Sequence, residues 1–189
     1  ALEGAGALFR RVFGQADACL IADGNTDAAA GAAVAAALAA AGVTVRRHVL
    51  PAVPRPKPSV ELGEELRAVL ARDGAVPVAV GSGVLNDLVK YAAFRLDRPY
   101  LCVATAVSMD GYTSAGAPLS DRGIKKTIQC RPARAILADM DVIAKAPPEM
   151  ADPGDAGTAA PGGGGGTRQQ GEGEEEGADD KEPAPAADE

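Results

Sequence analysis

The stretch that decides the fold is VAVGSGVLNDLVKY, residues 78–91, which predicts a strand, a glycine turn and a helix in direct succession. The apolar run that ends at Val80 is short and β-branched, as is typical of a buried parallel strand. Residues 81–83 then turn the chain. From Val84 onward, apolar residues recur on one helical face, which indicates a helix directly after the turn.

This succession of elements also predicts an anion site, because the first backbone N–H groups of a helix have no partner within the helix. The helix dipole adds partial positive charge there, and glycine lets a phosphate approach the backbone closely. The turn lacks the third glycine of the common dinucleotide fingerprint and the lysine of a P-loop. The pattern alone therefore leaves two interpretations open, a phosphate or dinucleotide site and a plain turn.

Strands and helices alternate on both sides of this stretch. The alternation predicts an α/β fold, a doubly wound parallel sheet in a Rossmann-like nucleotide-binding domain. Ligands of such sheets bind beyond the carboxyl ends of the strands. The expected strands are Ala18–Ala22, Val43–Leu50, Val76–Val80, Tyr100–Ala104, Lys125–Gln129 and Ala135–Ala138, and the expected helices are Leu2–Phe13, Asp27–Ala41, Val60–Arg72 and one from Val84.

Residues typical of helix ends flank the expected helices. Asn25 or Thr26 is expected to cap the alanine-rich helix, and Gly42 to end it. Ser59 is expected to cap the following helix.

The helix after the glycine turn carries polar residues opposite its apolar face. Asn86 and Lys90 on this face are second-choice cofactor residues, behind the turn itself. A solvated helix face is at least as good an interpretation for Lys90.

The acidity of the chain is concentrated at its end. The formal net charge of the 189 residues is −7, with +2 on residues 1–150 and −9 on residues 151–189. The latter segment is rich in glycine, proline and acidic residues and has few large apolar side chains, so we expect a disordered tail. The basic residues are scattered along the chain, and we expect no nucleic-acid binding.

The cysteines and the apolar segments indicate a soluble cytoplasmic protein. Cys19, Cys102 and Cys130 lie in or beside apolar runs without metal or disulfide spacing, which predicts reduced, buried thiols. The alanine-rich stretch at 28–41 has a polar, capped start and few bulky residues. We therefore expect no signal peptide and no membrane insertion.

A hydroxyl-rich loop, TAVSMDGYTS at residues 105–114, follows the strand that ends at Ala104. Its hydroxyl groups could satisfy backbone groups of the loop itself, as they often do. Its position after a strand next to the glycine turn favours a contact with ligand instead.

Three segments together resemble the sn-glycerol-1-phosphate dehydrogenases: GSGVLNDLVKY at 81–91, the loop at 105–114, and ARAILADMDVIAKAPPEM at 133–150. That family belongs to the larger group of iron-containing alcohol dehydrogenases and dehydroquinate synthases, and the resemblance covers residues 17–150. It implies NAD(P)H-dependent, metal-assisted reduction of dihydroxyacetone phosphate to sn-glycerol 1-phosphate, a step of phospholipid biosynthesis. The implied ligands are NAD or NADP and a small phosphorylated ketone, and a homo-oligomer is compatible with the resemblance.

The same resemblance assigns roles to individual residues. The glycine turn would hold the cofactor pyrophosphate, Thr105 and Ser108 would border the nicotinamide half, and Asp110 would face the substrate. Asp23 matches an acidic position near the adenine ribose, and an ordinary Asx turn accounts for it equally well. The complete set of implied cofactor residues is Asp23, Gly81, Ser82, Gly83, Val84, Leu85, Thr105, Ser108 and Ser114.

The sequence departs from the family in its metal ligands. The family holds a divalent metal (zinc, nickel or iron) through one aspartate and two histidines of a C-terminal helical domain. This chain has one histidine, His48, on an expected strand, and the surroundings of Asp155 do not match the family motif. We therefore assign no metal ligand and no catalytic residue.

We expect a dinucleotide-binding domain at residues 1–150 and the disordered tail at 151–189, without the family's helical domain. Such a chain would be a fragment, whether a truncated or frame-shifted product or an incomplete record, with little or no dehydrogenase turnover. The alternative is a non-catalytic cofactor-binding or interaction remnant.

Overall fold

The computed structural model describes residues 1–107 and 110–146, apart from the side chains of residues 110 and 111. Its centre is a five-stranded parallel sheet with the strand order β2-β1-β3-β4-β7. The strands of the sheet are β1 (Ala18–Asp23), β2 (Val45–Leu50), β3 (Val76–Gly81), β4 (Leu101–Ala104) and β7 (Ala135–Ala138).

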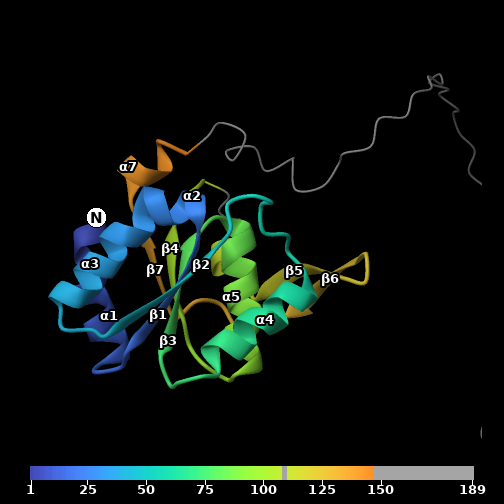
Figure 1. Ribbon diagram of the computed structural model, residues 1–189, viewed down its shortest axis with the longest axis horizontal. Helices are drawn as coiled ribbons and strands as arrows, with labels where there is room; N and C mark the ends of the chain where they lie inside the picture. Colours follow the sequence, from blue (N-terminus) through green and yellow to red (C-terminus); the bar gives the residue numbers. More distant parts are fainter. Residues whose placement is uncertain (108–109, 147–189) are drawn as a thin grey trace, which may run out of the picture. The chain divides into compact units, whose positions relative to one another are not determined.

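Helices cover both faces of this sheet (Figure 1). Helices α1 (Ala5–Phe13) and α3 (Ala32–Ala40) lie on one face, and α4 (Val60–Leu70) and α5 (Gly83–Arg95) lie on the other. Side chains alternate between the two faces along a strand. Leu20 therefore joins the apolar cluster of α1 and α3, whereas its neighbour Ile21 joins that of α4 and α5. The predicted doubly wound α/β fold is confirmed.

The strand order creates a crevice beside β1. From β1 the chain passes to β2 on one side and then returns to β3 on the other, so Ala18 pairs with both Val45 and Val76. Ligands of open parallel sheets bind at such a reversal of strand order, beyond the carboxyl ends of the strands. Asp23 ends β1 at this edge, and Gly81 ends β3.

The start of the alanine-rich segment differs from the prediction. Asp23, rather than Asn25 or Thr26, is the N-cap: its Oδ1 accepts bonds of 2.9 Å from the backbone N–H groups of both residues. The Thr26 hydroxyl accepts a 3.0 Å bond from the Asp23 N–H, which completes a capping box. Three successive pieces replace the single helix expected from Asp27: α2 (Gly24–Thr26), the π-helical turn η2 (Asp27–Gly31) and α3.

The other predicted helix ends are confirmed. The Ser59 Oγ accepts a 3.2 Å bond from the Leu62 N–H at the start of α4. Gly42 has a φ of +74°, which glycine tolerates, immediately after the end of α3. The short elements at the two ends of the described region are η1 (Leu2–Gly4) and α7 (Met140–Ile143).

A hairpin separate from the main sheet was only half predicted. Strands β5 (Gly116–Asp121) and β6 (Ile124–Gln129) pair antiparallel, and β6 is the polar, exposed strand expected from the sequence. The sequence of β5 contains glycine and proline, which are rare in strands, so the pattern did not reveal it. Positive φ values of 51° at Arg122 and 82° at Gly123 suit the type I′ turn of a two-residue hairpin loop.

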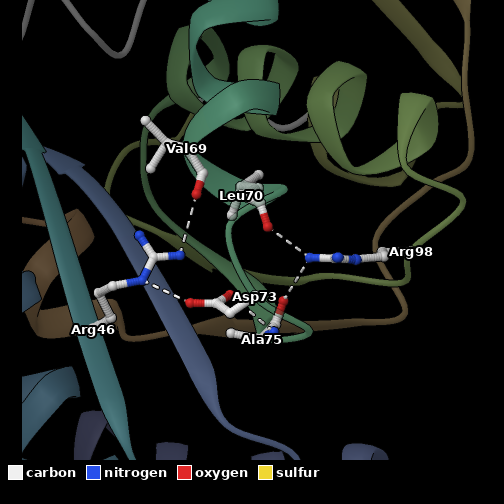
Figure 2. Close-up of polar contacts among 6 residues, drawn as sticks. All are labelled: Arg46, Val69, Leu70, Asp73, Ala75 and Arg98. Atoms are coloured by element: carbon white, nitrogen blue, oxygen red, sulfur yellow. Dashed lines mark hydrogen bonds and ion pairs between the residues drawn. The ribbon is translucent and has the colours of Figure 1, made fainter.

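Two arginines near the amino ends of β2 and β4 bond to backbone carbonyls of α4 (Figure 2). Arg98 Nη1 donates a 2.7 Å bond to the carbonyl of Leu70, and Arg46 Nη2 a 3.3 Å bond to that of Val69. These carbonyls belong to the last turn of α4, where cations complement unpaired acceptors and the helix dipole. The Nε of Arg46 also lies 2.9 Å from Asp73 Oδ2, and this bond holds the pKa of Asp73 below its ordinary value.

Candidate functional site

A cavity of about 620 Å³ lies at the carboxyl edge of the sheet. This volume is within the range of about 300–1,000 Å³ that is usual for small-molecule sites. Its walls are formed by the segments that follow β1, β2, β3, β4 and β7. The lining residues are Asp23, Gly24, Asn25, Thr26, Ala28, Ala29, Arg55, Pro56, Ser82, Val84, Leu85, Thr105, Asp139, Asp141, Val142, Lys145 and Ala146.

The glycine turn supplies one wall of this cavity. Ser82 is the N-cap of α5 and has extended backbone angles, and its side chain makes no capping hydrogen bond. Val84 and Leu85 follow it along the wall. The first N–H groups of this 13-residue helix have no partner within the helix, which makes the turn suitable for an anion.

Gly81 allows β3 and α5 to pack closely at the turn. It is not among the residues that line the cavity. A Cβ atom on Gly81 would lie 2.6 Å from the Cβ of Leu85, a distance that real side chains do not adopt. Its carbonyl accepts a 3.2 Å bond from the N–H of Thr105. Glycine is therefore required here for the close packing of β3, α5 and the end of β4.

The segment after β4 is tied to the glycine turn. Thr105, 6% exposed, lines the cavity next to Ser82. Tyr112, 1% exposed, belongs to the unexpected short helix α6 (Asp110–Thr113), and its hydroxyl lies 3.3 Å from the Gly81 carbonyl and 3.2 Å from that of Ala106. Thr105 and Tyr112 therefore both contact Gly81, at the end of β3.

Of the remaining predicted residues of this loop, Ser114 is described and is not among the residues that line the cavity. The Ser114 Oγ bonds to the backbone of Gly116, accepting from its N–H at 3.1 Å and donating to its carbonyl at 3.2 Å. Ser108 lies outside the described residues, and so does the side chain of Asp110. The roles of these three residues stay predictions.

The polar residues of α5 are buried, so the interpretation of Lys90 as part of a solvated helix face was wrong. Asn86 and Lys90 are 0% exposed and Asp87 is 6% exposed. The hairpin, which the sequence did not reveal, covers this face: Lys90 Nζ donates a 2.8 Å bond to the carbonyl of Gly116 in β5. Asn86 Oδ1 accepts a 2.9 Å bond from the Tyr100 hydroxyl.

Asp23 also lines the cavity, at the end of β1. Both of its capping bonds fall on Oδ1, so the second carboxylate oxygen can accept a bond from a ligand hydroxyl. Sequence reasoning did not identify Arg55, Asp139 and Lys145 among the lining residues. Their positions after β2 and β7, at the carboxyl edge of a parallel sheet, could have indicated them.

The described residues do not fit a catalytic metal. No group of three or more histidine, cysteine, aspartate or glutamate side chains in this region is placed to hold a metal ion. His48 lies on the edge strand β2 and does not line the cavity; burial, with the charges of Arg46 and Arg72, lowers its pKa. Asp155 lies outside the described residues.

The three cysteines are buried free thiols, as predicted. Burial raises the pKa of Cys102 to about 12. None of the helices in the described part of the chain is long and apolar enough to cross a membrane.

The family model of the iron-containing alcohol dehydrogenases matches residues 1–147. The chain belongs to the iron-containing alcohol dehydrogenase family. Curated relatives of this family member are glycerol-1-phosphate dehydrogenases [NAD(P)+], which confirms the resemblance found in the sequence. The protein from Bacillus velezensis is 35% identical over 69% of this chain and 34% of its own length. That from Bacillus subtilis is 48% identical over 40% of this chain and 19% of its own length. The chain thus spans about a third or less of these relatives.

Solved structures share the fold of this chain. The iron-containing alcohol dehydrogenase of Thermococcus thioreducens matches with a TM-score of 0.65 and 20% identity, over 79% of this chain and 46% of that protein. The 2-epi-5-epi-valiolone synthase of Streptomyces hygroscopicus, solved with NAD+ and Zn2+ bound, matches with a TM-score of 0.58 and 24% identity, over 73% of this chain and 40% of that protein.

Proposed function

We propose that residues 1–150 are the dinucleotide-binding domain of an NAD(P)-dependent sn-glycerol-1-phosphate dehydrogenase, which reduces dihydroxyacetone phosphate. The observation that carries this proposal is that Asp23, Ser82 and Thr105, from three neighbouring strand ends, line one cavity. The names of the curated relatives, glycerol-1-phosphate dehydrogenase [NAD(P)+], support the choice of substrate and cofactor.

The cavity suggests how the dinucleotide is held. The pyrophosphate lies against the first N–H groups of α5, at Ser82 and Gly83, where a helix of 13 residues begins. The adenosine ribose donates a hydroxyl hydrogen bond to Asp23. The nicotinamide half extends past Thr105 toward Ser108 and Asp110, with Asp110 facing the substrate. Val84 and Leu85 exclude water from the phosphate end of the cavity.

The described residues supply binding and orientation. When bound, the nicotinamide supplies the hydride for the ketone. The bonds of the Gly81 carbonyl to Thr105 N–H and the Tyr112 hydroxyl fix the relative position of the pyrophosphate turn and the loop that follows β4. Such fixed positioning of cofactor and substrate segments is a main protein contribution to cofactor-dependent reactions.

We further propose that these 189 residues bind the dinucleotide without turning over substrate by themselves. The metal of the resembled family polarises the ketone and needs two histidines, whereas this chain has one. The acidic segment at 151–189, for which the sequence predicts disorder, lies outside the described residues. The buried free thiols favour a reducing compartment, which supports a cytoplasmic location.

Two measurements on the purified 189-residue chain test this proposal. Isothermal titration with NADH and NADPH should give saturable binding. Oxidation of either cofactor with dihydroxyacetone phosphate and added zinc or nickel should not exceed the rate without protein, while the Bacillus subtilis enzyme, as control, is active. Absence of binding would refute the assignment of the cavity, and substrate-dependent oxidation would refute the proposed lack of turnover.

The alternative is an interaction module descended from the family without cofactor binding. The same titration separates the two, because a module of this kind would bind neither NADH nor NADPH. We favour dinucleotide binding because Asp23, Ser82 and Thr105, which the resemblance assigns to the cofactor, all line the cavity.

A further inference from the structure

Arg55 is one of two cations, with Lys145, among the described residues that line the cavity. It lies on the segment between β2 and α4, directly after the strand that pairs with β1. Asp23 pairs in register with Leu50, so this segment leaves the sheet beside the Asp23 carboxylate. Neither the charge pattern of the sequence nor the resemblance assigned a role to Arg55.

The backbone that carries Arg55 is held against the turn that carries Asp23. A Cβ atom on Gly24 would lie 3.1 Å from the Cβ of Ala52 and 3.5 Å from its N, so the two segments are packed closely. Residues 51–58 read PAVPRPKP, and proline fixes φ and restricts the residue before it. The backbone at Arg55 is thus conformationally restricted, whereas its side chain is exposed.

A second cation of the cavity, Lys145, is placed differently. It follows β7, which is separated from β1 by β3 and β4. With about 4.8 Å between neighbouring strands, β7 lies about 14 Å from β1. Arg55 therefore follows the strand that pairs with β1, whereas Lys145 follows a strand that is separated from β1 by two others.

The charges of Asp23 and Arg55 should affect the binding of NADH and of NADPH differently. A carboxylate accepts a bond from the ribose 2′-hydroxyl of NADH, but it repels the 2′-phosphate of NADPH. A guanidinium binds phosphate through two parallel charged hydrogen bonds and offsets this repulsion. The proposed function places the adenosine ribose at Asp23, next to the segment of Arg55.

We propose that Arg55 binds the 2′-phosphate of NADPH, so that the cavity accepts NADPH as well as NADH despite the carboxylate of Asp23. This inference rests on the proposed function, because it uses the position of the adenosine ribose. Arg55 acts as a specificity residue and is not required for NADH.

The test is isothermal titration of the 189-residue chain with NADH, NADPH, 5′-AMP and 2′,5′-ADP at low salt. The variant Arg55→Gln should bind NADPH and 2′,5′-ADP about tenfold more weakly, as expected for the loss of a charged hydrogen-bond pair. It should bind NADH and 5′-AMP as the wild type does. Because Arg55 is exposed, we expect the variant to fold normally.

Two matched controls carry the same change of charge. Lys57→Gln alters an exposed cation of the same segment that does not line the cavity, and Lys145→Gln alters the other lining cation, which follows β7. Neither should change the ratio of the NADPH and NADH affinities.

The possible results separate this inference from the proposed function. Equal affinities of wild type and Arg55→Gln for NADPH, or an equal loss for NADPH and NADH, would overturn the role of Arg55 while the dinucleotide site stands. Failure of the wild-type chain to bind any of the four nucleotides would overturn the proposed function, and the inference with it.

Discussion

Asp87 and Lys90 face each other one helical turn apart inside the domain, with 3.1 Å between Asp87 Oδ1 and Lys90 Nζ. Both side chains are almost completely removed from solvent, and the lysine also reaches the carbonyl of Gly116. Burial raises the pKa of Asp87 to about 6, although the charge of Lys90 acts in the opposite direction. This pair joins the helix that follows the glycine turn to the hairpin.

The titration of Asp87 should make stability depend on pH. Its pKa is higher in the folded state, about 6, than the ordinary value of 3.8, so the folded state binds the proton more tightly. The stabilisation from this group is complete below about pH 4 and is lost as the pH rises through 6. The excess unfolding free energy of the wild type over Asp87→Asn should therefore decrease between pH 4 and 6, as measured by urea denaturation.

Asp121→Asn is the matched control for this experiment. Asp121 pairs with Lys126 on the exposed hairpin, and its pKa is lowered by that bond, so its titration falls below this pH window. The excess unfolding free energy of the wild type over Asp121→Asn should not decrease from pH 4 to 6, because a lowered pKa gives the opposite sign. Absence of a decrease for Asp87→Asn as well would contradict a raised pKa of Asp87.

Replacement of Gly81 by alanine should damage both stability and binding. The new Cβ would lie 2.6 Å from Leu85 Cβ, so β3 and α5 would have to separate. We expect a loss of about 1–3 kcal/mol in unfolding free energy and weaker NADH binding. Gly74→Ala is the control, since a Cβ there meets no atom within 4 Å. Unchanged NADH affinity and stability in Gly81→Ala would show that this close packing is not needed.

The hydroxyl of Tyr112 should be worth about 1 kcal/mol of stability, because it reaches two buried carbonyl groups, those of Gly81 and Ala106. Tyr112→Phe should lower the urea midpoint accordingly. It should also weaken NADH binding, because the hydrogen bond from the Tyr112 hydroxyl to the Gly81 carbonyl of the glycine turn is lost. Tyr91→Phe is a comparison outside the cavity, because its hydroxyl donates to Glu64 at 2.7 Å. It should leave NADH affinity unchanged. A larger effect on affinity from Tyr91→Phe than from Tyr112→Phe would contradict this account.

Arg98 should stabilise the fold without affecting ligand binding. Its bond of 2.7 Å to the Leu70 carbonyl satisfies an acceptor at the end of α4, on the edge of the sheet opposite the cavity (Figure 2). We expect Arg98→Ala to cost about 1–2 kcal/mol in urea denaturation and to leave NADH affinity unchanged. Arg11→Ala, a change of an exposed arginine on α1, should cost under about 0.5 kcal/mol. Equal losses for the two variants would count against the capping role.

The sequence was sufficient for the main sheet because its three inner strands, β1, β3 and β4, are short apolar runs. Val76–Gly81 is buried along its whole length, and the helix after it begins at the predicted turn. The N-cap at Asp23 was missed because Asp23, Asn25 and Thr26 can all cap a helix, and only the geometry at the end of β1 selects among them.

The hairpin and the polar side of α5 could not be predicted from local pattern. Gly116–Asp121 contains residues that disfavour strands, and it forms one only through pairing with the next strand. Its position over α5 buries Lys90, whose charge and spacing alone indicated solvent. Arg55 was missed for a similar reason, since a loop residue enters a site only through the tertiary fold.

The most direct test of the dinucleotide site is the NADH affinity of Ser82→Asp. Aspartate is a good N-cap, so the change should preserve or increase the stability of α5 while placing a negative charge where the pyrophosphate is proposed to lie. Ser59→Asp makes the same substitution at the N-cap of α4, outside the cavity. The account predicts that Ser82→Asp weakens NADH binding at least about tenfold and that Ser59→Asp does not. Equal NADH affinity in wild type and Ser82→Asp, with both folded, would contradict it.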